Sequence, residues 1–184
     1  MAKYRRTRKY TRASRRSRWA SNIVDIGPNS FVLSTPSDWN FTEYTLITNP
    51  DYSNQLTSNL YTIKNVEVAI NFDTSTLANS EAIENLQFYI MYAPQSIAVG
   101  QDYAIKHPEF IMAMRYYGEP GVDSTNNQLN MAPCYAGPLR IKTRLSRKLN
   151  TGDRIILFIR AANTTTSSAT AQYGGICRWW TKAN

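Results

Sequence analysis

Apolar and polar residues alternate along most of the chain from residue 20 onward, in short segments separated by stretches rich in Asn, Ser and Thr. The clearest segment places Val66, Val68, Ile70 and Phe72 on one face, with polar or small residues between them. This period of two is typical of a half-buried β-strand. The continuous apolar run at 155–159 instead predicts a strand that is buried on both faces.

The same pattern predicts eight strands, near residues 29–35, 44–48, 61–72, 86–93, 109–117, 138–147, 153–162 and 174–182. One short helix is predicted at 79–85, and the connections at 49–60 and 118–137 are long. Eight strands without a helical layer indicate an all-β sandwich. An eight-stranded viral jelly-roll sandwich tolerates such long loops, and we therefore predict that fold.

Positive charge is concentrated in the first 18 residues, whereas the rest of the chain has a net charge of −1. The basic residues of this segment are Lys3, Arg5, Arg6, Arg8, Lys9, Arg12, Arg15, Arg16 and Arg18. A segment so charged repels itself and has too little apolar surface to fold alone. We therefore predict a disordered arm over residues 1–19 and a single β domain over residues 20–184.

Nucleic acid is the natural partner of this arm. Most of its charges are Arg, whose planar guanidinium contacts a phosphate through two hydrogen bonds. Tyr4, Tyr10 and Trp19 lie among or directly after these charges, where they can stack on unpaired bases. A solvated tail, or a nuclear import signal alone, is the alternative interpretation.

A second basic group is predicted on the strand at 138–147. In an extended chain Arg140, Lys142 and Arg144 project from one face, with Leu139, Ile141, Thr143 and Leu145 on the other. Like charges spaced about 6.7 Å apart repel one another unless an anion lies against them. This face is therefore either a surface that follows nucleic-acid phosphates, an ordinary solvated face, or a face paired with acids of a neighbouring strand or subunit.

Trp179 and Trp180 are adjacent in the last predicted strand, so their side chains point to opposite faces. Both cannot enter the same core. We predict that one indole lies in the core and that the other meets a partner subunit.

The sequence contains no recognisable catalytic or metal-binding motif, and we expect neither an enzyme nor a cofactor. Its one histidine, His107, precedes a proline, and a structural role is expected for it. Cys134 and Cys177 lack metal-ligand spacing and are expected to be free thiols in a reducing compartment. No apolar stretch is long enough for a membrane span, and the basic N-terminal segment predicts no secretion signal.

Three runs of residues resemble a known family. They are residues 107–120 (HPEFIMAMRYYGEP), 149–157 (LNTGDRIIL) and 175–184 (GICRWWTKAN). In this order, and after an Arg-rich start, they resemble capsid proteins of circular Rep-encoding single-stranded DNA viruses, the circovirus-like group. The resemblance covers most of the chain.

The resemblance implies a single jelly roll, about sixty copies of which close into a small icosahedral shell of the T=1 kind. It also implies that the arm lies inside on a single-stranded DNA genome and doubles as a nuclear localisation signal read by host import receptors. The location implied is the virion, and the host nucleus during assembly. The alternatives are the coat protein of a small satellite-type RNA virus, a monomeric nucleic-acid-binding β-barrel, and a secreted lectin-like sandwich.

Overall fold

The computed structural model describes residues 19–34, 39–49, 61–73, 83–117, 122–123, 128–129, 138–163 and 168–183, and every structural statement below concerns these residues. The predictions made for residues 1–18, including disorder and all nine arm charges, lie outside them. The same holds for Cys134 and for residues 50–60 of the connection predicted at 49–60.

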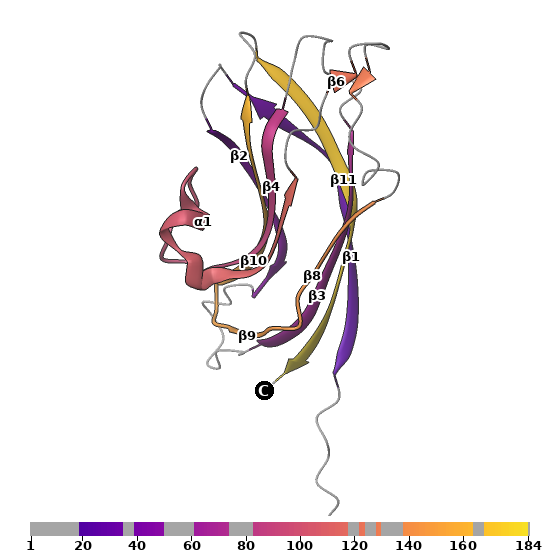
Figure 1. Ribbon diagram of the computed structural model, residues 1–184. Helices are drawn as coiled ribbons and strands as arrows, with labels where there is room; N and C mark the ends of the chain where they lie inside the picture. The colour runs from indigo at the N-terminus through magenta and orange to yellow at the C-terminus, as the bar shows by residue number, and fades with distance from the viewer. Residues whose placement is uncertain are drawn as a thin grey trace, which may run out of the picture.

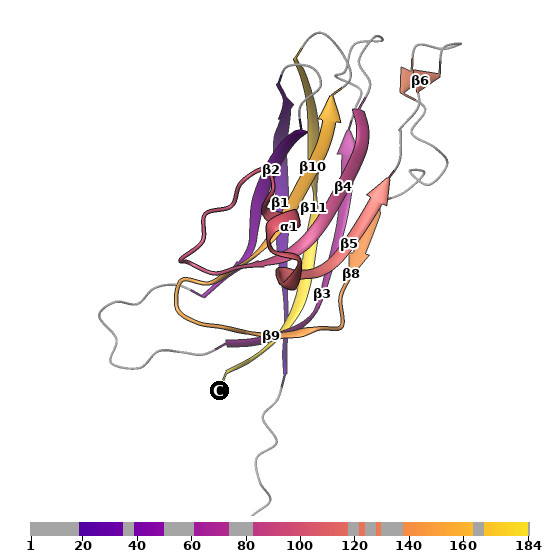
Figure 2. The same cartoon turned by 60° about the vertical axis from the view of Figure 1, so that its left-hand side comes forward.

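The described chain is built almost entirely of antiparallel strands (Figures 1 and 2). The long strands are β1 (Ala20–Leu33), β2 (Trp39–Thr48), β3 (Tyr61–Asp73), β4 (Ile83–Ala93), β5 (Ile111–Tyr117), β10 (Arg154–Asn163) and β11 (Ala169–Ala183). Shorter elements are β6 (Val122–Asp123), β7 (Gln128–Leu129), β8 (Leu139–Lys142), β9 (Ser146–Leu149), the helix α1 (Tyr103–Lys106) and the 3-10 turn η1 (Pro108–Phe110).

Two sheets form the sandwich. One has the order β1-β11-β3-β8, with β9 also pairing with β3, and the other has the order β2-β10-β4-β5. The pairs are nested: β1 pairs with β11, β2 with β10, β3 with β8, and β4 with β5. Such nesting results when one long hairpin is rolled into two facing sheets, which is the jelly roll. The predicted all-β jelly-roll fold is therefore confirmed.

The main core lies between the sheets and follows the predicted alternation. Val66, Val68 and Ile70 are buried, whereas the residues between them are more exposed. The run at 155–159 is buried on both faces, as predicted. Ile155, Leu157 and Ile159 enter the main core, while Ile156 and Phe158 point away from it.

A second apolar cluster covers the outer face of the β2-β10-β4-β5 sheet. Here Ile156 and Phe158 of β10 pack beneath Tyr103 and Ala104 of α1. Figures 1 and 2 show α1 lying over the strands of this sheet, on the side away from β1 and β11. Arg160 is also buried on this side, with its guanidinium over the Trp39 ring and 3.6 Å from the Asp102 carboxylate. The segment 94–110 therefore occupies one outer face of the sandwich.

Three local predictions were wrong. The predicted helix at 79–85 is contradicted at residues 83–85, which belong to β4. The strand predicted at 138–147 divides into β8 and β9, because the chain leaves the ladder at residues 143–145. The first strand begins at Ala20 rather than near residue 29, because Ala20 already pairs with Thr181 of β11.

A buried carboxylate joins three connections at one end of the sandwich. Asp153 accepts hydrogen bonds from the Tyr92 hydroxyl at 2.6 Å, from the Asn150 backbone N–H at 2.8 Å and from the Gln95 backbone N–H at 3.3 Å. Gly152 precedes it with φ +81°, a conformation that favours glycine. The run LNTGD is therefore a turn that holds β9, β10 and the end of β4 together.

Replacing Tyr92 with Phe should lower the free energy of unfolding at neutral pH by about 1–2 kcal/mol, because Asp153 loses a donor. Burial and the Asp153 hydrogen bond raise the pKa of Tyr92 to about 12. A raised pKa means that this stability is present below pH 10 and is lost as pH rises toward 12. Urea unfolding between pH 7 and 12 measures both effects.

The matched control for this substitution is Tyr116→Phe, since the Tyr116 hydroxyl donates to Asn85 on an exposed surface. That variant should unfold like the wild type at pH 7. Equal stability of the Tyr92→Phe chain and the wild type would show that the Asp153 cluster does not stabilise the fold.

Candidate nucleic-acid interface

Most of the basic residues in the described strands have their side chains on the outer face of the β1-β11-β3-β8 sheet. In contrast to the opposite sheet, no described segment packs over this face. The strand registers place side chains from β1, β11, β3 and β8 or β9 in successive rows across it. Neighbouring rows on one face are separated by about 6.7 Å.

The register identifies the members of each row. The row nearest the start of β1 contains Lys182, Thr62 and Lys148, and the next contains Ser21, Trp180, Lys64 and Ser146. The third contains Ile23, Arg178, Glu67 and Lys142, and the fourth contains Asp25, Ile176, Ala69 and Arg140. In these four rows, six cations share the face with the two acids Asp25 and Glu67: the cations are Lys64, Arg140, Lys142, Lys148, Arg178 and Lys182.

Two of these cations lie against indole rings. The Lys64 ammonium is 3.9 Å from the centre of the Trp19 ring, and the Arg178 guanidinium is 4.7 Å from that of Trp180. Arg178 also donates to the Ser21 hydroxyl at 3.4 Å. These contacts confirm that residues of β1, β11 and β3 meet on the outer face.

The predicted basic strand is found partly as expected. Arg140, Lys142 and Arg144 are exposed, and Leu139, Ile141 and Thr143 are buried. Leu145, predicted to point inward, is 51% exposed because the chain has left β8 at that point.

The Lys142 ammonium lies 3.8 Å from the Glu67 carboxylate on the neighbouring strand, which supports the pairing interpretation for this one residue. Its side chain is more than half exposed, so solvent screens the pair. Arg140 and Arg144 have no ion-pair partner among the residues that the structure describes. Their contact with phosphates stays a prediction.

The two adjacent tryptophans point to opposite faces. Trp179 packs against the main core between the sheets, and Trp180 lies under Arg178 on the outer face. The core position predicted for one indole is thus confirmed. A contact of Trp180 or Trp179 with a second copy stays a prediction.

Sequence reasoning missed Lys64, Lys148, Arg178 and Lys182 as part of this surface. They come from three strands that are distant in sequence, and only the register brings them into neighbouring rows. The period-two spacing of Arg178, Trp180 and Lys182 is the signal that places these three side chains on one face.

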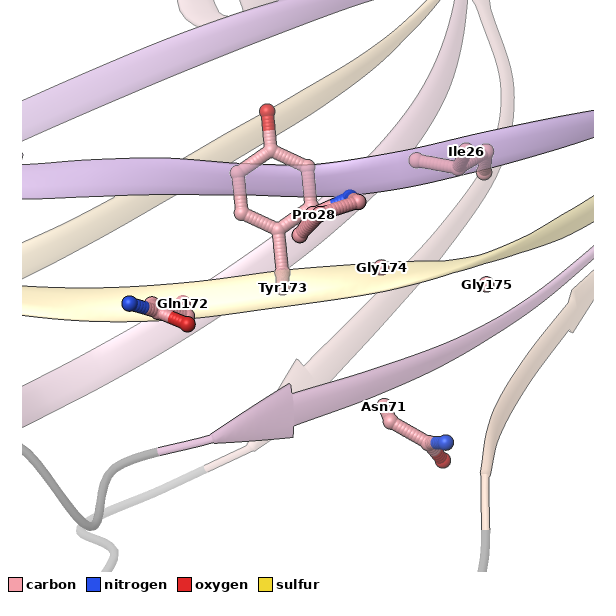
Figure 3. A pocket seen from close by; sticks show the side chains of 7 residues that line it. All are labelled: Ile26, Pro28, Asn71, Gln172, Tyr173, Gly174 and Gly175. Atoms are coloured by element: carbon pink, nitrogen blue, oxygen red, sulfur yellow. The ribbon is translucent and has the colours of Figure 1, made fainter.

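A shallow groove interrupts the same sheet farther from the start of β1 (Figure 3). It measures about 320 Å³, and Gly174 and Gly175 form a floor without side chains between Pro28 of β1 and Asn71 of β3. A side chain at Gly175 would collide with the carbonyl oxygen of Ala69, so the strands require glycine here. Gly174 and Gly175 are both part of β11. No charged residue lines the groove.

Other chemistry is sparse in the described part of the chain. No group of three or more His, Cys, Asp or Glu residues there could hold a metal ion, and no helix there could cross a membrane. His107 stacks on Phe110 and lies beside Tyr103, in the structural role expected for it. Cys177 is a buried free thiol whose pKa burial raises to about 12, so it is a poor nucleophile at neutral pH.

Comparison with known proteins finds likenesses in structure alone. No family model and no curated protein matches the sequence. A decameric BFDV capsid protein is 8% identical over 91% of this chain and 99% of that one, with a TM-score of 0.37. A chain of maize chlorotic mottle virus is 9% identical over 90% of this chain and 92% of that one, with a TM-score of 0.37.

A chain of desmodium yellow mottle tymovirus is 9% identical, with a TM-score of 0.29, and the match covers 89% of each chain. TM-scores below 0.5 do not establish a common fold. The assignment of the jelly roll therefore rests on the nested strand order of this chain.

Replacing Glu67 with Gln should strengthen the binding of single-stranded DNA and make its dependence on salt steeper. The substitution releases Lys142 from its partner, and one more phosphate contact adds up to about 0.7 to the slope of log affinity against log salt. Fluorescence anisotropy with a labelled oligo-dT at several salt concentrations measures this slope.

The matched control is Glu109→Gln, because Glu109 is an exposed acid of η1 on the segment that covers the opposite sheet. It should leave the slope unchanged. If the Glu67→Gln variant also bound like the wild type, the outer face around Lys142 would be a paired, solvated face.

Proposed function

We propose that this chain is a structural capsid protein that assembles into a small closed shell and packages single-stranded DNA through its basic arm. The observation that carries the proposal is the distribution of charge relative to the fold. Nine basic residues precede Trp19. The chain then begins β1, and the start of β1 lies beside the rows of the sheet that contain Lys64, Lys148 and Lys182. The basic arm therefore directly precedes, in the sequence, the strand through which the chain joins the basic face of this sheet.

The capacity to assemble is supported by the exposed apolar residues. Ile23 and Val32 of β1, Phe41 of β2, and Met114 and Tyr116 of β5 are between 37% and 64% exposed. All of them belong to strands at sheet edges, where natural monomers usually place charges to prevent pairing. Edge strands of both sheets therefore expose apolar side chains, which suits a subunit that contacts several neighbours.

Packaging and assembly are coupled electrostatically in this proposal. Arms gathered inside a shell repel one another until phosphates neutralise them, so cargo that binds the assembled state stabilises it. About sixty copies would neutralise roughly 500 phosphates through the arms alone, with release of counterions and without base specificity. The choice of DNA over RNA, and of about sixty copies, follows from the resemblance of the sequence to circovirus-like capsid proteins.

The same resemblance places the protein in the virion and, during assembly, in the host nucleus. An Arg-rich arm of this kind also suits recognition by host nuclear import receptors. Both assignments belong to the proposal.

Deleting residues 1–18 should leave a β domain that folds cooperatively and assembles but no longer protects nucleic acid from nuclease. The deletion removes nine charges, whereas the nested strand pairs begin at Ala20. Thermal unfolding followed by circular dichroism tests the fold, and nuclease protection with electron microscopy tests packaging.

The matched control keeps the length of the arm but replaces its basic residues with Gln, and it should behave like the deletion. Loss of the cooperative unfolding transition on deletion would contradict the modular arrangement. Nuclease protection that survives both changes would show that the arm does not hold the cargo.

A further inference from the structure

We propose that Trp19, Lys64, Arg178 and Trp180 form a stacking site for unpaired nucleic-acid bases on the outer face of the β1-β11-β3-β8 sheet. The inference rests on the proposed function and assigns it a specific contact beyond the arm. Its ligand is the nucleobase with its adjoining phosphate in a single strand, without preference for sequence.

The register brings these side chains together. Ser21 of β1, Trp180 of β11 and Lys64 of β3 occupy one row across three adjacent strands. Arg178 lies in the next row on the same face. Trp19 directly precedes β1, and its ring reaches the Lys64 ammonium at 3.9 Å. The two indoles and two cations thus form one continuous cluster.

The Arg178–Trp180 pair brings a planar cation against an aromatic ring. The Arg178 guanidinium lies 4.7 Å from the centre of the Trp180 indole ring. The Arg178 side chain is exposed, and its 3.4 Å hydrogen bond to the Ser21 hydroxyl uses only one N–H group of the guanidinium. Stacking of a base on such a pair gains from both the π-face and the positive charge.

Neither cation of the cluster is neutralised within the described part of the chain. Glu67 faces Arg178 in the register, but its carboxylate lies 3.8 Å from Lys142. Lys64 and Arg178 form no ion pair with any described residue, whereas Lys142, Lys106 and Arg154 each do. Two cations without an ion pair, each beside a half-buried indole ring, suit a ligand that carries one phosphate for every base.

Position relative to the arm supports the same ligand. Trp19 adjoins Arg18, so a strand held by the arm meets this cluster first when it reaches the folded domain. The face continues with Lys142, which lies in the same row as Arg178, and with Arg140 in the next row. A single strand therefore has a basic path from the arm across the sheet.

The test uses the full chain and a labelled oligo-dT of about 20 nucleotides, titrated by fluorescence anisotropy over a range of salt. Trp180→Leu should weaken binding about tenfold at every salt concentration and leave the salt slope unchanged, because it removes stacking and no charge. The double variant Lys64→Gln, Arg178→Gln should lower the slope by about 1.4, for two phosphate contacts on a single strand.

Arg178→Lys separates stacking from charge. It keeps the positive charge, so the slope should stay that of the wild type while binding weakens about threefold. The controls are Tyr116→Leu, an exposed aromatic residue of β5, and Lys106→Gln, an exposed cation of α1. Both lie on the opposite sheet or its cover and should bind like the wild type.

Wild-type affinity in both Trp180→Leu and Arg178→Lys would overturn the stacking site. So would a Trp180→Leu chain that binds oligo-dT normally but no longer forms particles, since Trp180 would then serve contacts between copies. If Trp180→Leu unfolds, Trp180→Phe replaces it, and this variant should keep binding within about threefold of the wild type.

Failure of the proposed function gives a different result. A wild-type chain that binds oligo-dT but remains a monomer would contradict the shell, while the same titrations would still measure the stacking site. If the wild-type chain packages nucleic acid but all variants bind oligo-dT equally, the proposed function stands and the stacking site is wrong.

Discussion

The register of β11 between β1 and β3 is the constraint on which the rest of the structure depends. Because side chains alternate along a strand, a slip of one residue would turn every side chain of β11 to the other face. The observed register places Cys177 and Trp179 with the core and Arg178 and Trp180 outside. Gly175 supports it, since any larger residue there would collide with Ala69 of β3.

The two outer faces of the sandwich differ in what covers them and in their charge. One is covered by residues 94–110, whose apolar side chains pack on the sheet and whose partly exposed Asp102 lies beside the buried Arg160 of β10. The other is left open by the described chain and carries cations from β11, β3, β8 and β9. The chain enters the domain on this second sheet, so the ligand that we propose for the basic arm is also the one that we propose for this face.

Much of the fold could be predicted because alternation is a local signal. The buried sides of β3 and β10 follow directly from the spacing of Val and Ile residues. The helix expected at 79–85 is contradicted at residues 83–85, where Ile83 and Glu84 pair with β10 as part of β4. The cations of the basic face were predicted only where they are continuous in sequence, at Arg140 and Lys142, because register across strands is not a local property.

Electron microscopy of the purified chain, with and without nuclease treatment, distinguishes a capsid subunit from a monomeric nucleic-acid-binding protein. For a capsid subunit we expect uniform closed particles whose internal nucleic acid survives the nuclease. A monomer that persists across all salt and protein concentrations would contradict it, and would make this jelly roll a small nucleic-acid-binding module instead.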